Sequence, residues 1–142
     1  MAEYVVHEPE DTLGEGRAEP RVLTDDVEIA DSTLSQMRGL MFRSEIPGAL
    51  VMEVGGGFSL TGGPPRQFVH MLFVREPLDV IWLADDEVQK VARMHPWRSV
   101  GMAKADRILE LPAGEAEGVS VGDTVQVLDR EAARERVATT AE

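Results

Sequence analysis

The chain has 142 residues, a formal net charge of −12 and no cysteine. This length suits one domain, and a hydrophobic content of 43% is too high for a fully disordered chain. The absence of cysteine excludes disulfides, thiolate metal sites and a cysteine nucleophile. No apolar run has the length of a membrane span, about 18 residues, and the start does not resemble a secretion signal. We therefore expect a soluble, cytoplasmic protein with no membrane partner.

The basic residues are unusual in type, because only Lys90 and Lys104 are lysines among 14 basic side chains. A lysine-poor, carboxylate-rich surface is typical of salt-adapted proteins. Its self-repulsion is relieved in molar salt, where the Debye length falls to about 3 Å. We expect halophilic adaptation and salt-dependent stability, with an ordinary acidic protein as the alternative. The net charge also disfavours nucleic acid as a partner.

The first part of the chain predicts two strands and one helix. Residues 1–20 form an acidic extension, either flexible or adding one edge strand. Residues 21–30 indicate a strand, an Asp-Asp turn and a second strand. A capping box at Thr33 and Gln36 begins an amphipathic pattern that predicts one short helix near residues 33–42.

The rest of the chain is dominated by short apolar segments separated by turn residues. Together they predict a mainly β fold, close to the α+β class. We expect a rolled antiparallel β-sandwich or partly open barrel, jelly-roll-like, over a single domain at 21–128. The polar tail at 129–142 is expected to be disordered or a frayed helix. The predicted strands cover residues 49–54, 67–74, 78–83, 88–94, 108–111 and 124–128.

Four motifs appear in the order known from one family. They read MRGLMFR at 37–43, PLDVI at 77–81, ILELPAG at 108–114 and GD at 122–123. On these motifs the chain resembles the uncharacterised family called domain of unknown function 192. The resemblance implies a mainly β, jelly-roll-like domain with no established activity. We expect structural roles for Gly39, where the helix packs closely, and for Gly114 and Gly122 in turns.

Asp79 is a candidate buried carboxylate, because in the predicted strand 78–83 it alternates onto the same face as Ile81 and Leu83. A buried carboxylate needs a partner, and Arg38 on the helix is the one expected. Asp79 is then either a structural clamp or turn cap, or an acid or base with a perturbed pKa. If the protein is an enzyme, Asp79 and Glu110 would act as paired carboxylates of a hydrolase.

The segment 93–98 brings together chemistry suited to planar or anionic ligands. Its two guanidinium groups offer paired hydrogen bonds, and its tryptophan offers a stacking surface, although this ring can instead fill the barrel edge. The leading hypothesis is a non-catalytic module for a small ligand or anion, at a site shared with the glycine-rich loop 55–63. The expected ligand-binding residues are Arg38, Arg93, His95, Trp97 and Arg98.

The remaining expectations concern partners and cofactors. The three histidines lack metal-ligand spacing, so we expect no metal and no cofactor. The partner is an unidentified small molecule or protein, and the chain is expected to be a monomer. An accessory protein that binds a partner without a pocket is the third hypothesis.

Overall fold

The computed structural model describes residues 3–10, 19–30, 46–54, 64–71 and 74–140. Within them the chain forms ten strands and the helix α2 (Arg130–Thr140). The strands are β1 (Glu3–Glu8), β2 (Arg21–Thr24), β3 (Val27–Ala30), β4 (Ala49–Glu53), β5 (Arg66–His70), β6 (Leu78–Ala84), β7 (Glu87–Met94), β8 (Val100–Lys104), β9 (Arg107–Pro112) and β10 (Thr124–Asp129).

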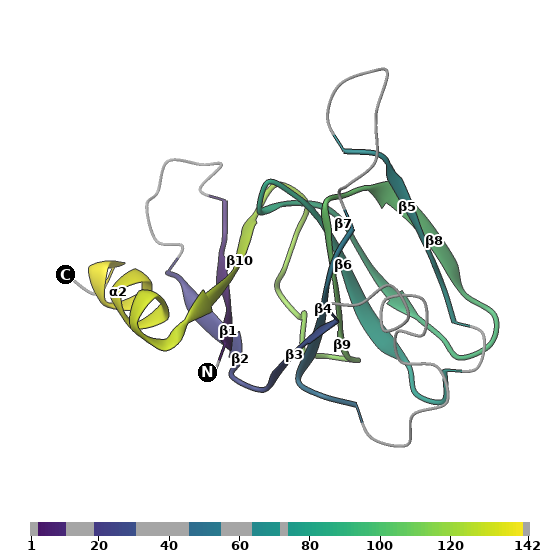
Figure 1. Ribbon diagram of the computed structural model, residues 1–142, viewed down its shortest axis with the longest axis horizontal. Helices are drawn as coiled ribbons and strands as arrows, with labels where there is room; N and C mark the ends of the chain where they lie inside the picture. Colours follow the sequence, from purple (N-terminus) through teal and green to yellow (C-terminus); the bar gives the residue numbers. More distant parts are fainter. Residues whose placement is uncertain (1–2, 11–18, 31–45, 55–63, 72–73, 141–142) are drawn as a thin grey trace.

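Eight of these strands form one large sheet, in the order β2-β1-β10-β7-β6-β9-β4-β3 (Figure 1). The strands β2 and β3 lie at its opposite edges, although only Asp25 and Asp26 separate them in the chain. The sheet therefore rolls until its two edges come close together, without closing into a barrel in the part of the chain described. The predicted mainly β fold is confirmed. One pair, β3–β4, is parallel, so the sheet is mixed rather than wholly antiparallel.

The predicted strand–turn–strand at 21–30 forms both strands, but they do not pair with each other. β2 pairs with β1, and β3 pairs with β4. The reason is the Asp25–Asp26 connection, which carries the chain from one sheet edge to the other instead of folding a hairpin. The predicted helix near 33–42, with Gly39, lies outside the described residues.

The two ends of the chain have defined structure where they are described. β1 is an internal strand, between β2 and β10, and α2 packs on β10 and β1. The division of the chain at residues 20 and 128 stays a prediction. No helix in the described ranges is both long and apolar enough to cross a membrane.

Strand β6 organises the interior because both of its faces are buried. Leu78, Val80 and Trp82 belong to one apolar cluster, which extends to β5. Ile81 and Leu83 belong to a second cluster, inside the rolled sheet. This division follows from the alternation of side chains along a strand, and it matches the parity predicted from the sequence.

The strands β5 and β8 form a separate two-stranded ribbon, on the far side of the molecule from α2 (Figure 1). Trp82 fixes the ribbon to the large sheet. Its indole Nε1 donates a hydrogen bond of 3.1 Å to the carbonyl of Gln67 on β5. Its ring lies so close to Gly101 on β8 that a Cβ there would come within 2.7 Å of the ring. Gly101 is therefore the residue that lets β8 cross over the indole.

The substitution Gly101→Ala is expected to destabilise the fold by about 1–3 kcal/mol, because the added methyl group overpacks a rigid, fully buried indole. Urea unfolding measures this loss. The neighbouring substitution Met102→Ala removes an outward-facing side chain and should change the free energy of unfolding by about 0.5 kcal/mol or less. Equal stability of the Gly101→Ala variant and the native protein would contradict the packing described.

Candidate functional site

Asp79 is buried on β6, and its carboxylate is fully engaged by neighbouring groups. Oδ2 accepts hydrogen bonds from the backbone N–H groups of Gly114, at 2.9 Å, and Ala116, at 3.1 Å. Oδ1 accepts one of 3.0 Å from Nε of Arg93, which lies directly opposite Asp79 in the β6–β7 register. Asp79 thus holds the turn after β9 against the sheet.

The guanidinium that pairs with Asp79 comes from β7. The expected partner, Arg38, lies outside the described residues. The Arg93 side chain is 53% exposed, and its hydrogen bond and charge interaction with Asp79 raise the pKa of its guanidinium above the ordinary value. Gly114 donates to Asp79 from a backbone with φ of +100°, a conformation that favours glycine.

An open depression of about 400 Å³ lies beside this pair. It is lined by Asp79, Val91, Arg93, Ala116 and Glu117. The single guanidinium there already binds one carboxylate and lies near a second, Glu117. An anion entering the depression would meet both negative charges, so this hollow is a poor anion site.

Glu110 does not share a cleft with Asp79. In the β6–β9 register Glu110 lies opposite Val80, whereas Asp79 lies opposite Leu111. Paired residues point to the same face of a sheet and successive residues to opposite faces, so the sheet itself separates the two carboxylates. The predicted hydrolase pair is therefore not assembled, although both side chains are buried.

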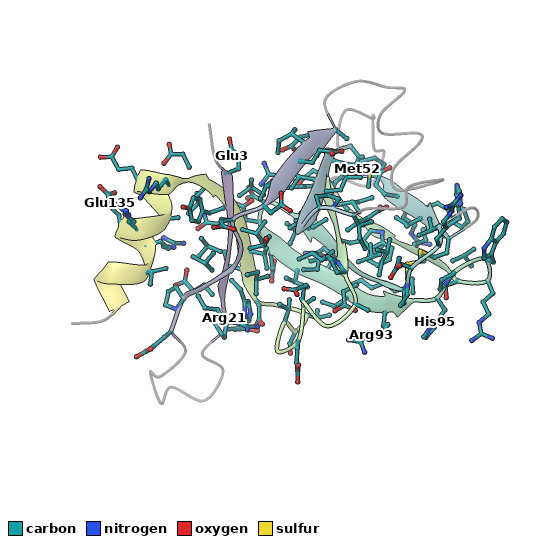
Figure 2. The ribbon with its side chains drawn as sticks, turned by 90° about the horizontal axis from the view of Figure 1, so that it is seen from below. Glu3, Arg21, Met52, Arg93, His95 and Glu135 are labelled. Carbon is teal, nitrogen blue, oxygen red and sulfur yellow. The ribbon has the colours of Figure 1, made fainter. Side chains whose placement is uncertain are left out.

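The residues predicted at 93–98 lie along the end of β7 and the turn after it, and of them only Arg93 lines the depression beside Asp79. Arg93 and His95 lie on one margin of the molecule, at the end opposite Glu135 (Figure 2). The His95 N–H donates to Oγ of Ser99, at 2.8 Å, and the Trp97 N–H donates to the carbonyl of Met71, also at 2.8 Å. These bonds place the turn beside the end of the β5–β8 ribbon. The glycine-rich loop 55–63, expected to complete the site, lies outside the described residues.

Trp97 and Arg98 are exposed in this turn, and His95 before them is exposed too. The Trp97 side chain is 56% exposed, and its backbone has a φ of 72°, which is rare for a bulky residue. Such a conformation persists only where the surroundings impose it, and here the bond to Met71 holds it. Arg98 follows directly and is exposed as well.

The outer face of the β5–β8 ribbon, which we call the ribbon face, was not predicted as a site. It consists of three cross-strand pairs, Arg66–Lys104, Phe68–Met102 and His70–Val100. Phe68, Val100 and Met102 are 59%, 66% and 49% exposed, whereas the alternating residue Val69 is buried. Neither strand contains an acidic residue. The alternation in residues 66–70 is the one sequence signal that points to this face.

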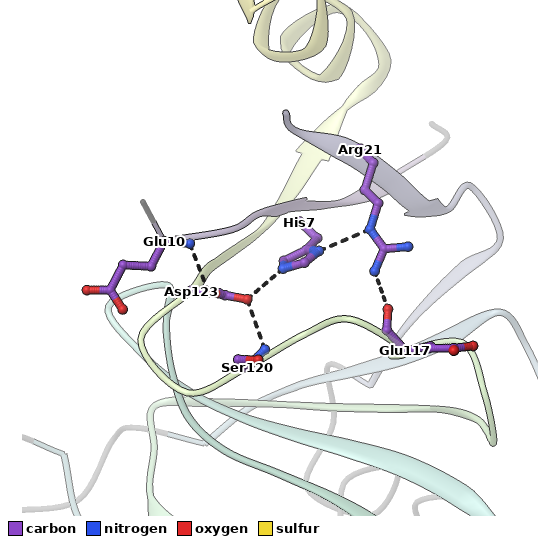
Figure 3. Close-up of polar contacts among 6 residues, drawn as sticks. All are labelled: His7, Glu10, Arg21, Glu117, Ser120 and Asp123. Atoms are coloured by element: carbon purple, nitrogen blue, oxygen red, sulfur yellow. Dashed lines mark hydrogen bonds and ion pairs between the residues drawn. The ribbon is translucent and has the colours of Figure 1, made fainter. Parts of the chain in front are cut away.

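A second buried polar cluster joins β1 to the turn before β10 (Figure 3). His7 Nε2 lies 2.8 Å from Oδ2 of Asp123, and Nε of Arg21 donates to His7 Nδ1 at 3.1 Å. Because arginine only donates, Nδ1 accepts and Nε2 carries the proton. Arg21 also donates to the carbonyl of Glu117.

Asp123 is held by backbone groups as well as by His7. Its carboxylate accepts the N–H groups of Glu10, at 2.8 Å, and Ser120, at 2.9 Å. Burial acts to raise the pKa of Asp123, but these hydrogen bonds together outweigh it and leave the pKa below the ordinary value. Gly122, beside it, has a φ of +96°, and a Cβ there would collide with the Glu10 carboxylate.

Among the described residues, no three histidine, aspartate or glutamate side chains gather as metal ligands. The main features of the described residues are thus the exposed ribbon face and the hydrogen-bonded carboxylates of Asp79 and Asp123. Asp79 and Asp123 stabilise turns through their hydrogen bonds, and the ribbon face is exposed to solvent.

Removing the carboxylate in the substitution Asp79→Ala should destabilise the fold by about 2–3 kcal/mol, because it leaves the N–H groups of Gly114 and Ala116 without their acceptor. The substitution Arg93→Ala should cost less, since its side chain is half exposed. Chemical denaturation of both variants measures the difference. An Asp79→Ala protein as stable as the native one would show that the carboxylate is not structural.

Comparisons with known proteins identify relatives of this chain. It is 32% identical over 109 residues to a UPF0127 protein of Thermococcus sibiricus, covering 74% of this chain and 68% of that protein. It is 35% identical over 108 residues to a UPF0127 protein of Pyrococcus furiosus, covering 71% of this chain and 85% of that protein. Neither name describes an activity.

Two solved structures share the fold. One, titled a putative transcription regulator, comes from Sinorhizobium meliloti, with a TM-score of 0.66, 21% identity, and coverage of 89% of this chain and 94% of that one. The other is a protein of unknown function from Novosphingobium aromaticivorans, with a TM-score of 0.62, 23% identity, and coverage of 87% and 83%. At these identities the likeness concerns the fold alone.

The family model described as "Uncharacterized ACR" matches residues 16–127. This range holds all four motifs noted in the sequence. The chain therefore belongs to the DUF192 family.

Proposed function

We propose that this protein is a non-catalytic binding module and that the ribbon face is its binding surface. The observation that carries the proposal is the composition of that face, which joins exposed apolar side chains to cations without a single carboxylate. Large apolar side chains exposed together on one face are a common mark of interaction sites. On a chain with a net charge of −12, an acid-free face also stands out electrostatically.

The turn at 97–98 extends this surface. Trp97 and Arg98 come just before β8, and the bond from Trp97 to Met71 ties the turn to the residue after β5. An exposed tryptophan beside an arginine adds a flat ring and a guanidinium fork, both common where proteins bind partners. The predicted ligand-binding residues Trp97 and Arg98 thus fit the proposal, whereas Arg93 is engaged by Asp79.

Catalysis by paired carboxylates has weaker support. Asp79 is saturated by three hydrogen bonds, and Glu110 points to the other face of the sheet. A general acid or base must reach the proton that it transfers, and neither group is placed to share a substrate with the other.

Three small probes test the binding surface: phenylacetate, benzyl alcohol and benzylamine, which share a ring and differ in charge. Added to the ¹⁵N-labelled protein, they should shift amide signals of residues 66–70 and 97–104. Phenylacetate should bind most tightly and benzylamine least, because the face carries cations and no carboxylate.

The chain offers a matched control for these probes. Val100 and Val121 are 66% and 64% exposed, but only Val100 lies on the ribbon face. The substitution Val100→Ser should weaken the shifts at least about threefold, by loss of apolar contact, and Val121→Ser should leave them unchanged. Shifts centred on the Asp79–Arg93 depression would contradict the proposal.

We further propose that the protein works in a salt-adapted cytoplasm. The support is the excess of 26 acidic over 14 basic residues and the presence of two lysines only. Urea unfolding in about 3 M and about 0.1 M KCl should give a clearly higher midpoint in the concentrated salt, which screens the carboxylates. Sucrose, which is excluded from the surface without screening charge, is the control. Equal midpoints in the two salt concentrations would refute the salt adaptation.

A further inference from the structure

We infer that the partner of the ribbon face is a polypeptide segment in which acidic side chains lie two to four residues from apolar ones. This inference rests on the proposed function and specifies its partner. It is drawn from the order of the three cross-strand pairs, which changes from charged to apolar along the ribbon.

The charged end of the ribbon face is formed by one cross-strand pair. Arg66 and Lys104 are exposed and lie directly opposite each other. Like charges in this arrangement are unfavourable in an isolated sheet. No carboxylate in the described parts of the chain forms an ion pair with either of them. A partner that brings carboxylates to this pair removes the repulsion and gains two ionic hydrogen bonds.

The three cross-strand pairs of the ribbon face are evenly spaced. The Phe68–Met102 pair lies two residues beyond the cations, and the His70–Val100 pair lies four residues beyond. At about 3.3 Å per residue these are about 7 and 13 Å from the charged pair. An extended peptide has the same rise, so side chains at every second position match the three pairs. The geometry thus favours an acidic residue with apolar residues two and four positions away on one side of it.

Other classes of partner suit the ribbon face less well. A long polyanion such as single-stranded DNA is repelled by the net charge of −12, and the face offers few cations to release its counterions. An anionic membrane meets the same repulsion. A second copy docking face to face brings no carboxylate, because β5 and β8 contain none. A short acidic and apolar peptide carries few charges and fits both ends of the face.

Fluorescence anisotropy with a synthetic peptide tests the inference. The probe has two glutamates followed by leucines at every second position, with serines between them. Its control has lysines in place of the glutamates. The native protein should bind the acidic peptide at least tenfold more tightly than the lysine peptide. The double variant Arg66→Glu/Lys104→Glu should reverse this preference, which loss of folding alone does not do.

The matched variant Arg134→Glu, an exposed cation on α2, should keep the native preference. Equal binding of both peptides, with the small probes still mapped to the ribbon face, would overturn this inference and leave the proposed function standing. Tighter binding of oligothymidine, or self-association that Met102→Ser abolishes, would also overturn it. If the small probes fail to map to the face as well, the proposed function fails with it.

Discussion

The contact between Trp82 and the β5–β8 ribbon determines how this molecule presents its surface. The indole is fully buried, bonds to the backbone of β5 through Nε1, and lies under the bare backbone of Gly101 on β8. The Lys90 ammonium lies 5.4 Å from the ring centroid, which adds a cation–π contact. Because one residue contacts both strands, the ribbon is fixed to the sheet while its outer face remains exposed.

Asp79 and Asp123 have structural roles, although a buried carboxylate can also mark a catalytic acid or base. Asp79 accepts the backbone N–H groups of Gly114 and Ala116, and Asp123 accepts those of Glu10 and Ser120. A carboxylate that satisfies buried backbone donors is a structural group, and its oxygens are not available to a ligand. The hydrogen bonds of Asp79 and Asp123 thus fix the chain around residues 114–123 and at Glu10.

Much of the fold was predictable, because apolar alternation and turn residues directly encode strands. The parity of β6, with Trp82 on one face and Ile81 on the other, follows from period-two alternation. The turn between β6 and β7 lies at Asp85 and Asp86, with positive φ at both residues, which aspartate tolerates. Strand β8 was not predicted from the sequence. Its residues Gly101 and Ala103 are poor strand formers, although the small size of Gly101 is what lets the strand pass close to Trp82.

The candidate site was less predictable than the fold, because sites depend on pairings between distant segments. The sequence suggested Asp79 as a buried carboxylate, but its partner Arg93 is set by the β6–β7 register. The same register logic separates Asp79 from Glu110. The ribbon face needs the pairing of residues 66–70 with 100–104, and no local pattern encodes a contact over that distance. His7 was likewise hidden in a segment that composition described only as acidic.

In this proposal the ribbon face, kept exposed by the contact of the ribbon with Trp82, is the surface through which the protein binds. Hydrogen–deuterium exchange in the presence of the acidic peptide tests it most directly. We expect slower exchange in residues 66–70 and 97–104, with no change around Asp79 and Arg93. Protection confined to the Asp79–Arg93 depression, with the ribbon exchanging as in the free protein, would contradict it.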